Sequence, residues 1–159
     1  MNETQLVIRV ARSYDGEPVR KFLTGLSPAT QYLRFFAELP RVPPGMITRL
    51  ITVTPRQLVL LAVDGDAVVG HAMAVCAGDR TVDVGIVVAD AYRGARLGDR
   101  LLRHLIDTVT RYGVDEIHTD VLSQNRLVLE WLRRRLPDVR FEHSGTTVAA
   151  HGHLGVPAA

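Results

Sequence analysis

The chain has 159 residues, of which 47% are hydrophobic and 23% are charged. This balance excludes a wholly disordered chain, and the length predicts one globular domain. The 19 basic and 17 acidic residues leave a formal net charge of +2, too small to make nucleic acid the leading partner. Lys21 is the only lysine, so arginine supplies nearly all of the positive charge.

Cysteine content and targeting signals bound the location of the protein. Cys76 is the only cysteine, which excludes an internal disulfide and a cysteine-based metal site. The first five residues lack the basic region and apolar stretch of a secretory signal, and no run approaches the ~18 apolar residues of a membrane helix. We therefore expect a cytoplasmic protein with no membrane partner. No metal is expected, because His143, His151 and His153 lie at or near a tail, 152–159, that should fray.

The first third of the chain predicts one strand and three helices. Alternating apolar residues indicate a strand at 5–12, and Asp15 can cap a helix at about 16–25. Ser27 followed by Pro28 is typical of a helix start, and Pro40 ends that second helix after Leu39. A third short helix is expected at about 44–52. The aromatic residues of the second helix are expected mostly in the core: Tyr32, Phe35 and Phe36.

The rest of the chain predicts a sheet with two further helices. Residues 57–89 indicate a three-stranded antiparallel meander, with a hairpin turn at Asp64-Gly65. A long amphipathic helix at about 95–112 and a strand at 115–122 follow, so the strand at 81–89 should pair with it in parallel through a right-handed crossover. A helix at about 125–136 and one or two strands within 139–150 complete the chain.

The expected order is therefore β-α-α-α-β-β-β-α-β-α-β-β. This is a mixed α/β arrangement (α+β in character) with a central, mostly antiparallel sheet flanked by helices. We expect a single domain over residues 1–159, with its core at about 5–150.

The segment between the strand at 81–89 and the long helix predicts an anion site. The first turn of a helix carries unpaired N–H groups and a partial positive charge. Gly94, Ala95 and Gly98 keep the backbone accessible there, while Arg93 and Arg96 add charge. The segment has neither a Gly-Lys-Ser/Thr ending nor the three-glycine dinucleotide fingerprint, which points to a phosphate or pyrophosphate of another kind of ligand.

Two stretches resemble one protein family. Arg93-Gly94-Ala95-Arg96-Leu97-Gly98 resembles the acyl-CoA motif of the GCN5-related N-acetyltransferases (GNAT), Gln/Arg-x-x-Gly-x-Gly/Ala, with Arg96 in place of the inner glycine. The stretch from Leu26 to Phe36, LSPATQYLRFF, is similar to one in Pat-type bacterial protein lysine acetyltransferases. The order of strands and helices over about 5–145 also fits the GNAT fold.

The resemblance implies acetyl-CoA as co-substrate and a set of residues around it. Its pyrophosphate would lie on the backbone N–H groups of 94–99, near the Arg93 side chain, and its pantetheine arm would pair with the strand at 86–88. A main-chain N–H of that strand would hold the thioester carbonyl. Gly85 would mark a bulge that opens the slot. The implied cofactor-binding residues are Ile86, Val87, Val88, Arg93, Gly94, Ala95, Arg96, Leu97, Gly98, Asp99 and Asn125.

The resemblance also implies direct attack of an amine on the thioester, which needs a general base. Asp83 stands where Pat-type enzymes carry a glutamate, and its shorter side chain favours a water relay. Leu132 occupies the position at which many relatives use a tyrosine to reprotonate the thiolate.

Three functions remain open at this point. The leading one is acetylation of a protein lysine. A second is acetylation of a small amine, although residues 15–52 hold few acids, Asp15, Glu17 and Glu38, to attract a small cation. The third is a non-catalytic acyl-CoA-binding module. The sequence leaves monomer and homodimer equally open.

Overall fold

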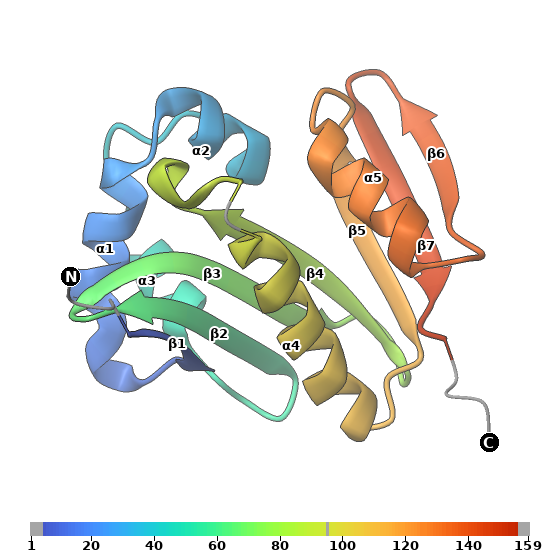
Figure 1. Ribbon diagram of the computed structural model, residues 1–159, viewed down its shortest axis with the longest axis horizontal. Helices are drawn as coiled ribbons and strands as arrows, with labels where there is room; N and C mark the ends of the chain where they lie inside the picture. Colours follow the sequence, from blue (N-terminus) through green and yellow to red (C-terminus); the bar gives the residue numbers. More distant parts are fainter. Residues whose placement is uncertain (1–4, 95, 156–159) are drawn as a thin grey trace.

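The computed structural model describes residues 5–94 and 96–155. Its elements, in chain order, are β1 (Leu6–Val10), α1 (Gly16–Gly25), α2 (Pro28–Phe35), α3 (Pro44–Ile51), β2 (Gln57–Asp64), β3 (Ala67–Cys76), β4 (Thr81–Val88), α4 (Leu97–Arg111), β5 (Glu116–Leu122), α5 (Arg126–Arg135), β6 (Arg140–Ser144) and β7 (Thr147–His153). Short 3-10 turns precede α1 and α4, at Ser13–Asp15 and Asp90–Tyr92. The predicted order of strands and helices is confirmed (Figure 1).

The strands form one seven-stranded sheet in the order β1-β2-β3-β4-β5-β7-β6. Every neighbouring pair is antiparallel except β4 and β5, which are parallel and joined through α4. This confirms the predicted crossover. In Figure 1, β4 and β5 begin together and then diverge, so that the sheet is split along part of its length. The functional residues gather at this split.

Helices cover both faces of the sheet (Figure 1). α4 and α5 pack on one face and share a core with the inner positions of the strands, including the predicted α4 stripe of Leu97, Leu101, Leu105 and Val109. α1 and α3 pack on the other face over a second core built around Val19, Leu23, Ile47 and Leu50. Burial of these apolar faces is the dominant stabilising term of such a fold.

The helix α2 differs from its prediction. It begins as expected, with the Ser27 side chain accepting a hydrogen bond from Thr30 N at 3.2 Å and Pro28 in the first position. It ends early, because Phe36 adopts a left-handed conformation with φ 60. Tyr32 and Phe36 are 39% and 41% exposed, so the expected burial of these aromatic residues was wrong.

The buried residues of α2 are instead polar. Gln31 is buried because its side chain amide donates to the carbonyls of Leu23 and Leu39 and its oxygen accepts from Leu39 N. These bonds stabilise the chain on both sides of α2. Thr30 is also buried and has partners described below.

Two smaller predictions, the cap of α1 and the turn between β2 and β3, also need correction. Asp15 makes no capping bond to α1, because its carboxylate receives Arg9 at 2.8 Å and Arg12 N at 2.6 Å. The β2–β3 turn consists of Gly65 and Asp66, since Asp64 already pairs with Ala67.

The C-terminal tail begins later than predicted. Gly152 and His153 belong to β7, and His153 N donates to Asp138 at 2.9 Å. The three histidines at this end lie on β6 and β7. Residues 156–159 lie outside the described part of the chain.

Within residues 5–94 and 96–155, none of the helices combines the length and the apolar character that crossing a membrane would require.

Candidate active site

A cleft opens where β4 and β5 separate. Their parallel pairing ends at Asp83↔His118, and beyond it Thr119 Oγ1 donates to the carbonyl of Val84 at 2.9 Å. Past this bond, β3 is the one described strand with which β4 still pairs. The N–H and C=O groups on the opposite edge of β4 are therefore directed toward the cleft. Such an edge offers N–H and C=O groups to a bound molecule.

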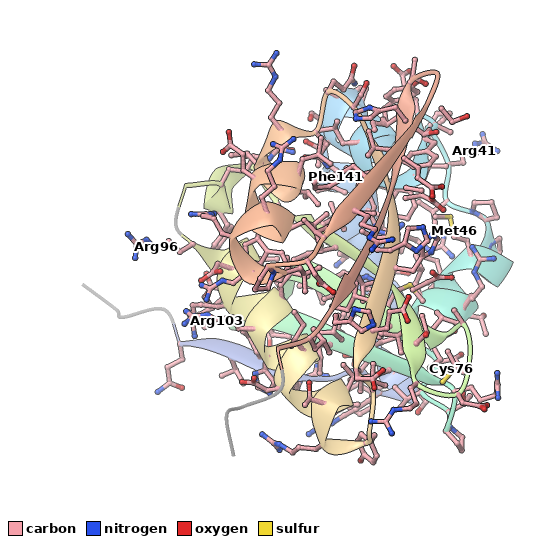
Figure 2. All side chains as sticks on the ribbon, turned by 90° about the vertical axis from the view of Figure 1, so that its right-hand side faces the viewer. Arg41, Met46, Cys76, Arg96, Arg103 and Phe141 are labelled. Atoms are coloured by element: carbon pink, nitrogen blue, oxygen red, sulfur yellow. The ribbon has the colours of Figure 1, made fainter. Side chains whose placement is uncertain are left out.

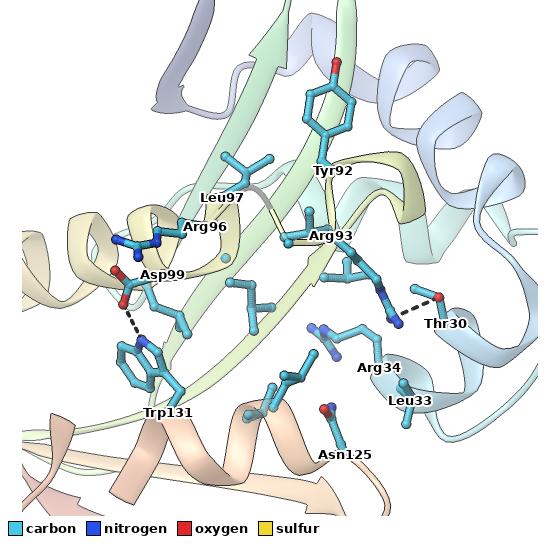
Figure 3. A pocket seen from close by; sticks show the side chains of 18 of the residues that line it. Thr30, Leu33, Arg34, Tyr92, Arg93, Arg96, Leu97, Asp99, Asn125 and Trp131 are labelled. Carbon is cyan, nitrogen blue, oxygen red and sulfur yellow. Dashed lines mark hydrogen bonds between the residues drawn. The ribbon is translucent and has the colours of Figure 1, made fainter. Parts of the chain in front are cut away.

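The cleft contains a cavity of about 310 Å³ with walls from α2, β4, the turn after β4, α4 and α5 (Figure 3). A smaller cavity of about 60 Å³ continues it between β4 and β5. Seven residues line both cavities: Leu33, Arg34, Ile86, Leu102, Asn125, Val128 and Trp131. The cleft is thus largely apolar with a few polar groups, as small-molecule sites usually are.

The structure brings the predicted cofactor residues together. Ten of them line the larger cavity: Ile86, Val87, Val88, Arg93, Gly94, Arg96, Leu97, Gly98, Asp99 and Asn125. The eleventh, Ala95, lies outside the described residues. Two local features of the chain produce this arrangement, the free edge of β4 and the turn into α4.

The turn into α4 leaves the N-terminus of that helix open. The side chain of its N-cap residue, Arg96, makes no capping bond within the described part of the chain, so the first N–H groups of a 15-residue helix keep their hydrogen-bonding capacity. A Cβ added to Gly98 would meet only side-chain atoms of Val88 and Ile86, at 3.8 and 4.0 Å. The glycine therefore leaves space toward the cavity, and an anion can approach the positive end of the helix dipole.

Arg96 has an unusual backbone for its residue type. Its φ of 61 lies in the left-handed region, as does the φ of 82 at Gly94. The resembling motif has glycine at the position of Arg96, and the left-handed backbone gives the physical reason, because glycine adopts it without a steric penalty. Figure 2 shows the Arg96 side chain extending outward from the start of α4.

The Arg93 side chain turns away from α4 and toward α2. Its Nη2 donates to Thr30 Oγ1 at 3.1 Å (Figure 3). Asp90 accepts hydrogen bonds from the hydroxyls of Thr30 and Ser27 and from Ser27 N, the last at 2.9 Å. The bond from Thr30 is the largest cause that lowers the pKa of Asp90. This network joins α2 to the turn and holds the Arg93 guanidinium at the α2 side of the cavity.

Asp99 places a carboxylate in the first turn of α4, where a bound anion would be repelled. Trp131 Nε1 donates to it at 2.7 Å, and Arg135 and Arg103 approach it at 3.0 and 3.1 Å. Burial acts to raise the pKa of Asp99, but the bonds from Trp131 and Arg135 outweigh it, and the pKa lies below its ordinary value. The carboxylate is therefore compensated and helps to join α5 to α4.

Asp83, the predicted base, pairs with a histidine. Its carboxylate bonds to Nδ1 of His118, its partner in the β4–β5 register. The ring of His118 packs against that of His151 of β7 at a tilt of 41°, with centroids 4.4 Å apart, and its Nε2 lies 4.0 Å from Asp120. Asp83 itself is 53% exposed and lines neither cavity, whereas Asp120 lines the smaller one.

His118 was not predicted as a site residue. The predicted parallel crossover could have pointed to it, because it places the strand at 115–122, which carries His118, beside the strand at 81–89, which carries Asp83. The register that pairs position 83 with position 118 needs the tertiary structure.

Two residues of the last helix region border the cleft as expected. Asn125 precedes α5, and its side chain makes no capping bond, so the amide remains available to the cavity (Figure 3). Leu132 is buried and lines the smaller cavity, so this position brings no hydroxyl to the cleft.

The predicted bulge at Gly85 is absent. The β3–β4 register runs without a shift from Gly70↔Val88 to Cys76↔Val82. The glycine has another consequence, because a Cβ there would lie 2.5 Å from Nη2 of Arg34. Arg34 comes from α2, and sequence reasoning did not single it out.

Comparison with known proteins identifies the family. The model of the acetyltransferase (GNAT) family matches residues 27–136. The acetyltransferase PA5475 of Pseudomonas aeruginosa is 32% identical over 127 residues, covering 76% of this chain and 68% of that protein. The chain belongs to the GNAT family of acetyltransferases.

Solved structures agree on the fold. The GNAT domain of PAT from S. lividans superposes with a TM-score of 0.84 at 19% identity, over 94% of this chain and 90% of that one. The ribosomal-protein-S18-alanine N-acetyltransferase from Escherichia coli gives 0.73 at 12% identity, over 97% of both chains. These likenesses support the fold alone.

Membership of the family makes the protein an N-acetyltransferase, and GNAT enzymes use acetyl-CoA as co-substrate. The cleft fits that molecule in three respects: an uncapped helix N-terminus for phosphates, a free strand edge for the amides of pantetheine, and an apolar cavity between them. Across the described ranges, no three His, Cys, Asp or Glu residues are grouped as metal ligands would be.

Proposed function

We propose that this GNAT protein transfers the acetyl group of acetyl-CoA to the side-chain amine of a protein lysine. The observation that carries the proposal is the cleft between β4 and β5, which runs from the uncapped turn of α4 to Val84 and Gly85, the residues that follow Asp83 in β4. Acetyl-CoA supplies the thioester, and the steps below belong to residues of this chain.

Backbone groups bind the co-substrate in this proposal. The N–H groups at the start of α4, from Gly94 to Asp99, hold the pyrophosphate, and the Arg96 and Arg103 side chains raise the local positive potential. The free edge of β4 at Ile86–Val88 pairs with the pantetheine amides. One N–H of this edge donates to the thioester carbonyl and stabilises the negative charge that develops there during attack.

Asp83 and His118 remove the proton from the acceptor amine. A lysine amine is mostly protonated at neutral pH, so it must lose a proton before it attacks. Asp83 lies two residues before Gly85 on the same face of β4, and Gly85 lines the smaller cavity. The bond between Asp83 and His118 offers a route for the proton. His118 in turn lies beside Asp120, which lines the smaller cavity.

The departing thiolate receives its proton from water in this proposal. Leu132 occupies the place of the tyrosine that the sequence resemblance would assign to this step, and its side chain is buried. A coenzyme A thiol is acidic enough to leave as a thiolate, so this step needs less assistance than deprotonation of the amine.

Two observations favour a lysine in a protein over a small cationic amine. Asp15, one of the few acids in the α1–α3 region, is 2% exposed and neutralised by Arg9, so this region offers a small cation little charge. The stretch LSPATQYLRFF, which resembles that of Pat-type enzymes, forms α2 at the edge of the cleft.

Thiol release from acetyl-CoA tests the proposal, with a panel of lysine-bearing proteins and small amines as acceptors. We expect turnover with at least one protein and a lower rate with the small amines. Failure to bind acetyl-CoA would overturn every enzymatic function. Binding without turnover on any acceptor would favour the non-catalytic module, and turnover confined to small amines would reject the lysine acceptor.

A further inference from the structure

Arg34 directs a positive charge into the inner part of the cleft. It lines both cavities, and Figure 3 shows its guanidinium extending from α2 toward the centre of the larger one. The guanidinium lies against Gly85 of β4, where a Cβ would come within 2.7 Å of its central carbon, Cζ. Any side chain at position 85 would displace it, so the glycine and the arginine form one feature.

The charge of Arg34 has no counterion among the described residues. Its Nε is buried without a hydrogen-bond partner, and none of the ion pairs between described residues includes it. The ring of Phe35 lies 4.9 Å from its Cζ and gives partial compensation. Burial lowers the pKa of Arg34 to about 10, and Arg49 acts in the same direction, so the group remains charged at neutral pH.

The surroundings of this cation favour an anion. After burial, the cause that lowers the pKa of Arg34 is the charge of another arginine, Arg49, and the buried His71 is kept neutral partly by Arg34 itself. A buried charge is unfavourable unless a partner of opposite sign and good geometry accompanies it. Because no such partner comes from the described chain, the natural source is a molecule that enters the cleft.

We propose that Arg34 binds a carboxylate carried by one of the two reactants. The proposal rests on the proposed function for the acyl transfer itself, and it specifies the chemistry of one reactant at that same site, in place of either acetyl-CoA as donor or the protein lysine as acceptor. A guanidinium presents a planar pair of N–H groups that matches a carboxylate. The phosphates of the co-substrate are assigned to the start of α4, at the other end of the cleft.

Two reactants can bring this carboxylate. It is the far end of the acyl group when the donor is a dicarboxylic acyl-CoA such as succinyl-CoA, or the α-carboxylate of the acceptor when the acceptor is an amino acid. In both cases the amine nitrogen forms a bond to the acyl carbon and the carbon–sulfur bond breaks. The amine proton passes to the Asp83–His118 pair, and coenzyme A leaves as a thiolate that water protonates.

Paired substrates that differ only in the carboxylate test the proposal on the full chain. The donor arm compares succinyl-CoA with butyryl-CoA on one acceptor. The acceptor arm uses acetyl-CoA and compares α-amino acids with their carboxamides. We expect kcat/KM to favour the carboxylate at least tenfold in one arm, and the arm that responds identifies the source. A ratio near one in both arms overturns the proposal without any variant.

Substitution of Arg34 tests whether it causes the preference. We expect Arg34→Gln to lower the carboxylate-to-neutral ratio at least tenfold and Arg34→Lys to restore part of it. The matched control is Arg41→Gln, because Arg41 is exposed, lines neither cavity and extends outward from the molecule (Figure 2), and it should leave the ratio unchanged. An equal loss on both members of a pair in Arg34→Gln would assign the residue to the reaction itself and overturn the carboxylate site.

A binding measurement separates this proposal from the proposed function. Titration calorimetry with succinate and with succinamide uses neither acetyl-CoA nor turnover. Succinate binding that is lost in Arg34→Gln supports the carboxylate site even if no acyl transfer is found. Acetyl-CoA turnover together with equal, weak binding of both compounds keeps the proposed function and rejects the carboxylate site.

Discussion

The two ends of the cleft are built in different ways. At the start of α4 the groups proposed to hold the phosphates are backbone N–H groups, and the described residues of this turn that line the cavity are close in sequence: Gly94 and 96–99. At the inner end the groups are side chains. Arg34 from α2 and Asp120 from β5 line the smaller cavity, and the bonded pair of Asp83 and His118 directly precedes two of its lining residues, Val84 and Thr119. A backbone site tolerates substitution of most side chains, whereas a side-chain site depends on each one.

The largest effect is expected from Asp83→Asn, at the side-chain end. The amide cannot accept the proton of the acceptor amine, so kcat should fall about a thousandfold while the Kd for acetyl-CoA stays within about twofold. Steady-state kinetics and calorimetry measure the two quantities. The control is Asp79→Asn, in the β3–β4 turn, which should retain full activity. A kcat above a tenth of the original value would remove Asp83 from the mechanism.

The next effect tests the backbone end. Gly98→Asp adds a carboxylate at the second position of α4 without a close contact, since the space around that Cβ is free to 3.8 Å. Repulsion of the phosphates should weaken acetyl-CoA binding about a hundredfold. Gly45→Asp is the matched control, because Gly45 is the second residue of α3, remote from the cleft, and has nothing within 4 Å of its Cβ position. Equal binding by the two variants would place the pyrophosphate elsewhere.

A third prediction concerns the buried His71, beneath the side-chain end. Burial lowers the pKa of His71 to about 4, with Arg34 adding to the shift, and the neutral ring donates from Nε2 to Leu50 O at 2.8 Å. In the unfolded chain this histidine has its ordinary pKa of 6.5, so the contribution to stability is present above that pH and is lost as pH falls toward 4. Between pH 7.5 and 5 the free energy of unfolding should drop by about 2 kcal/mol.

Urea unfolding at several pH values measures this drop. In His71→Gln the part of the pH dependence that belongs to this ring should disappear, whereas His104→Gln, at an exposed position of α4, should keep it. The same slope in both variants would show that His71 is protonated in the native protein.

The smallest effect is expected at Arg96, where it tests whether the left-handed backbone at the start of α4 costs stability. Arg96→Gly relieves the left-handed backbone and should raise the free energy of unfolding by about 1 kcal/mol. Arg100→Gly, inside α4, should lower it by about the same amount because glycine disfavours a helix interior. Urea denaturation compares them. Destabilisation by Arg96→Gly would mean that contacts of the arginine side chain outweigh the strain.

The same contrast explains which parts of the site the sequence could predict. The turn from Arg93 to Gly98 is a run of neighbouring residues, so its glycines, its arginines and the helix that follows predict an anion site without knowledge of any distant contact. The inner end could not be predicted in this way. Asp83 and His118 are 35 positions apart, and Trp131 and Asp99 are 32 apart.

The wrong predictions likewise concern positions where residues distant in sequence or the local backbone, rather than residue type, set the outcome. The bulge at Gly85 and the aromatic core of α2 were inferred from residue type, but Gly85 accommodates the Arg34 guanidinium and Tyr32 is exposed. At Gly85 a residue from another element, Arg34, decided the outcome, and local pattern carries no information about it.

The sequence by itself determined the order of strands and helices, the parallel crossover and the open turn of α4, because periodicity, caps and glycines act within a few residues. The tertiary structure alone decided that β4 and β5 separate after Asp83, that His118 meets that carboxylate, and that Arg34, which has no ion-pair partner among the described residues, enters the cleft. The physical reason is that strand register and the burial of a charge depend on contacts between segments distant in sequence. Those contacts exist only when the sheet and its helices are packed.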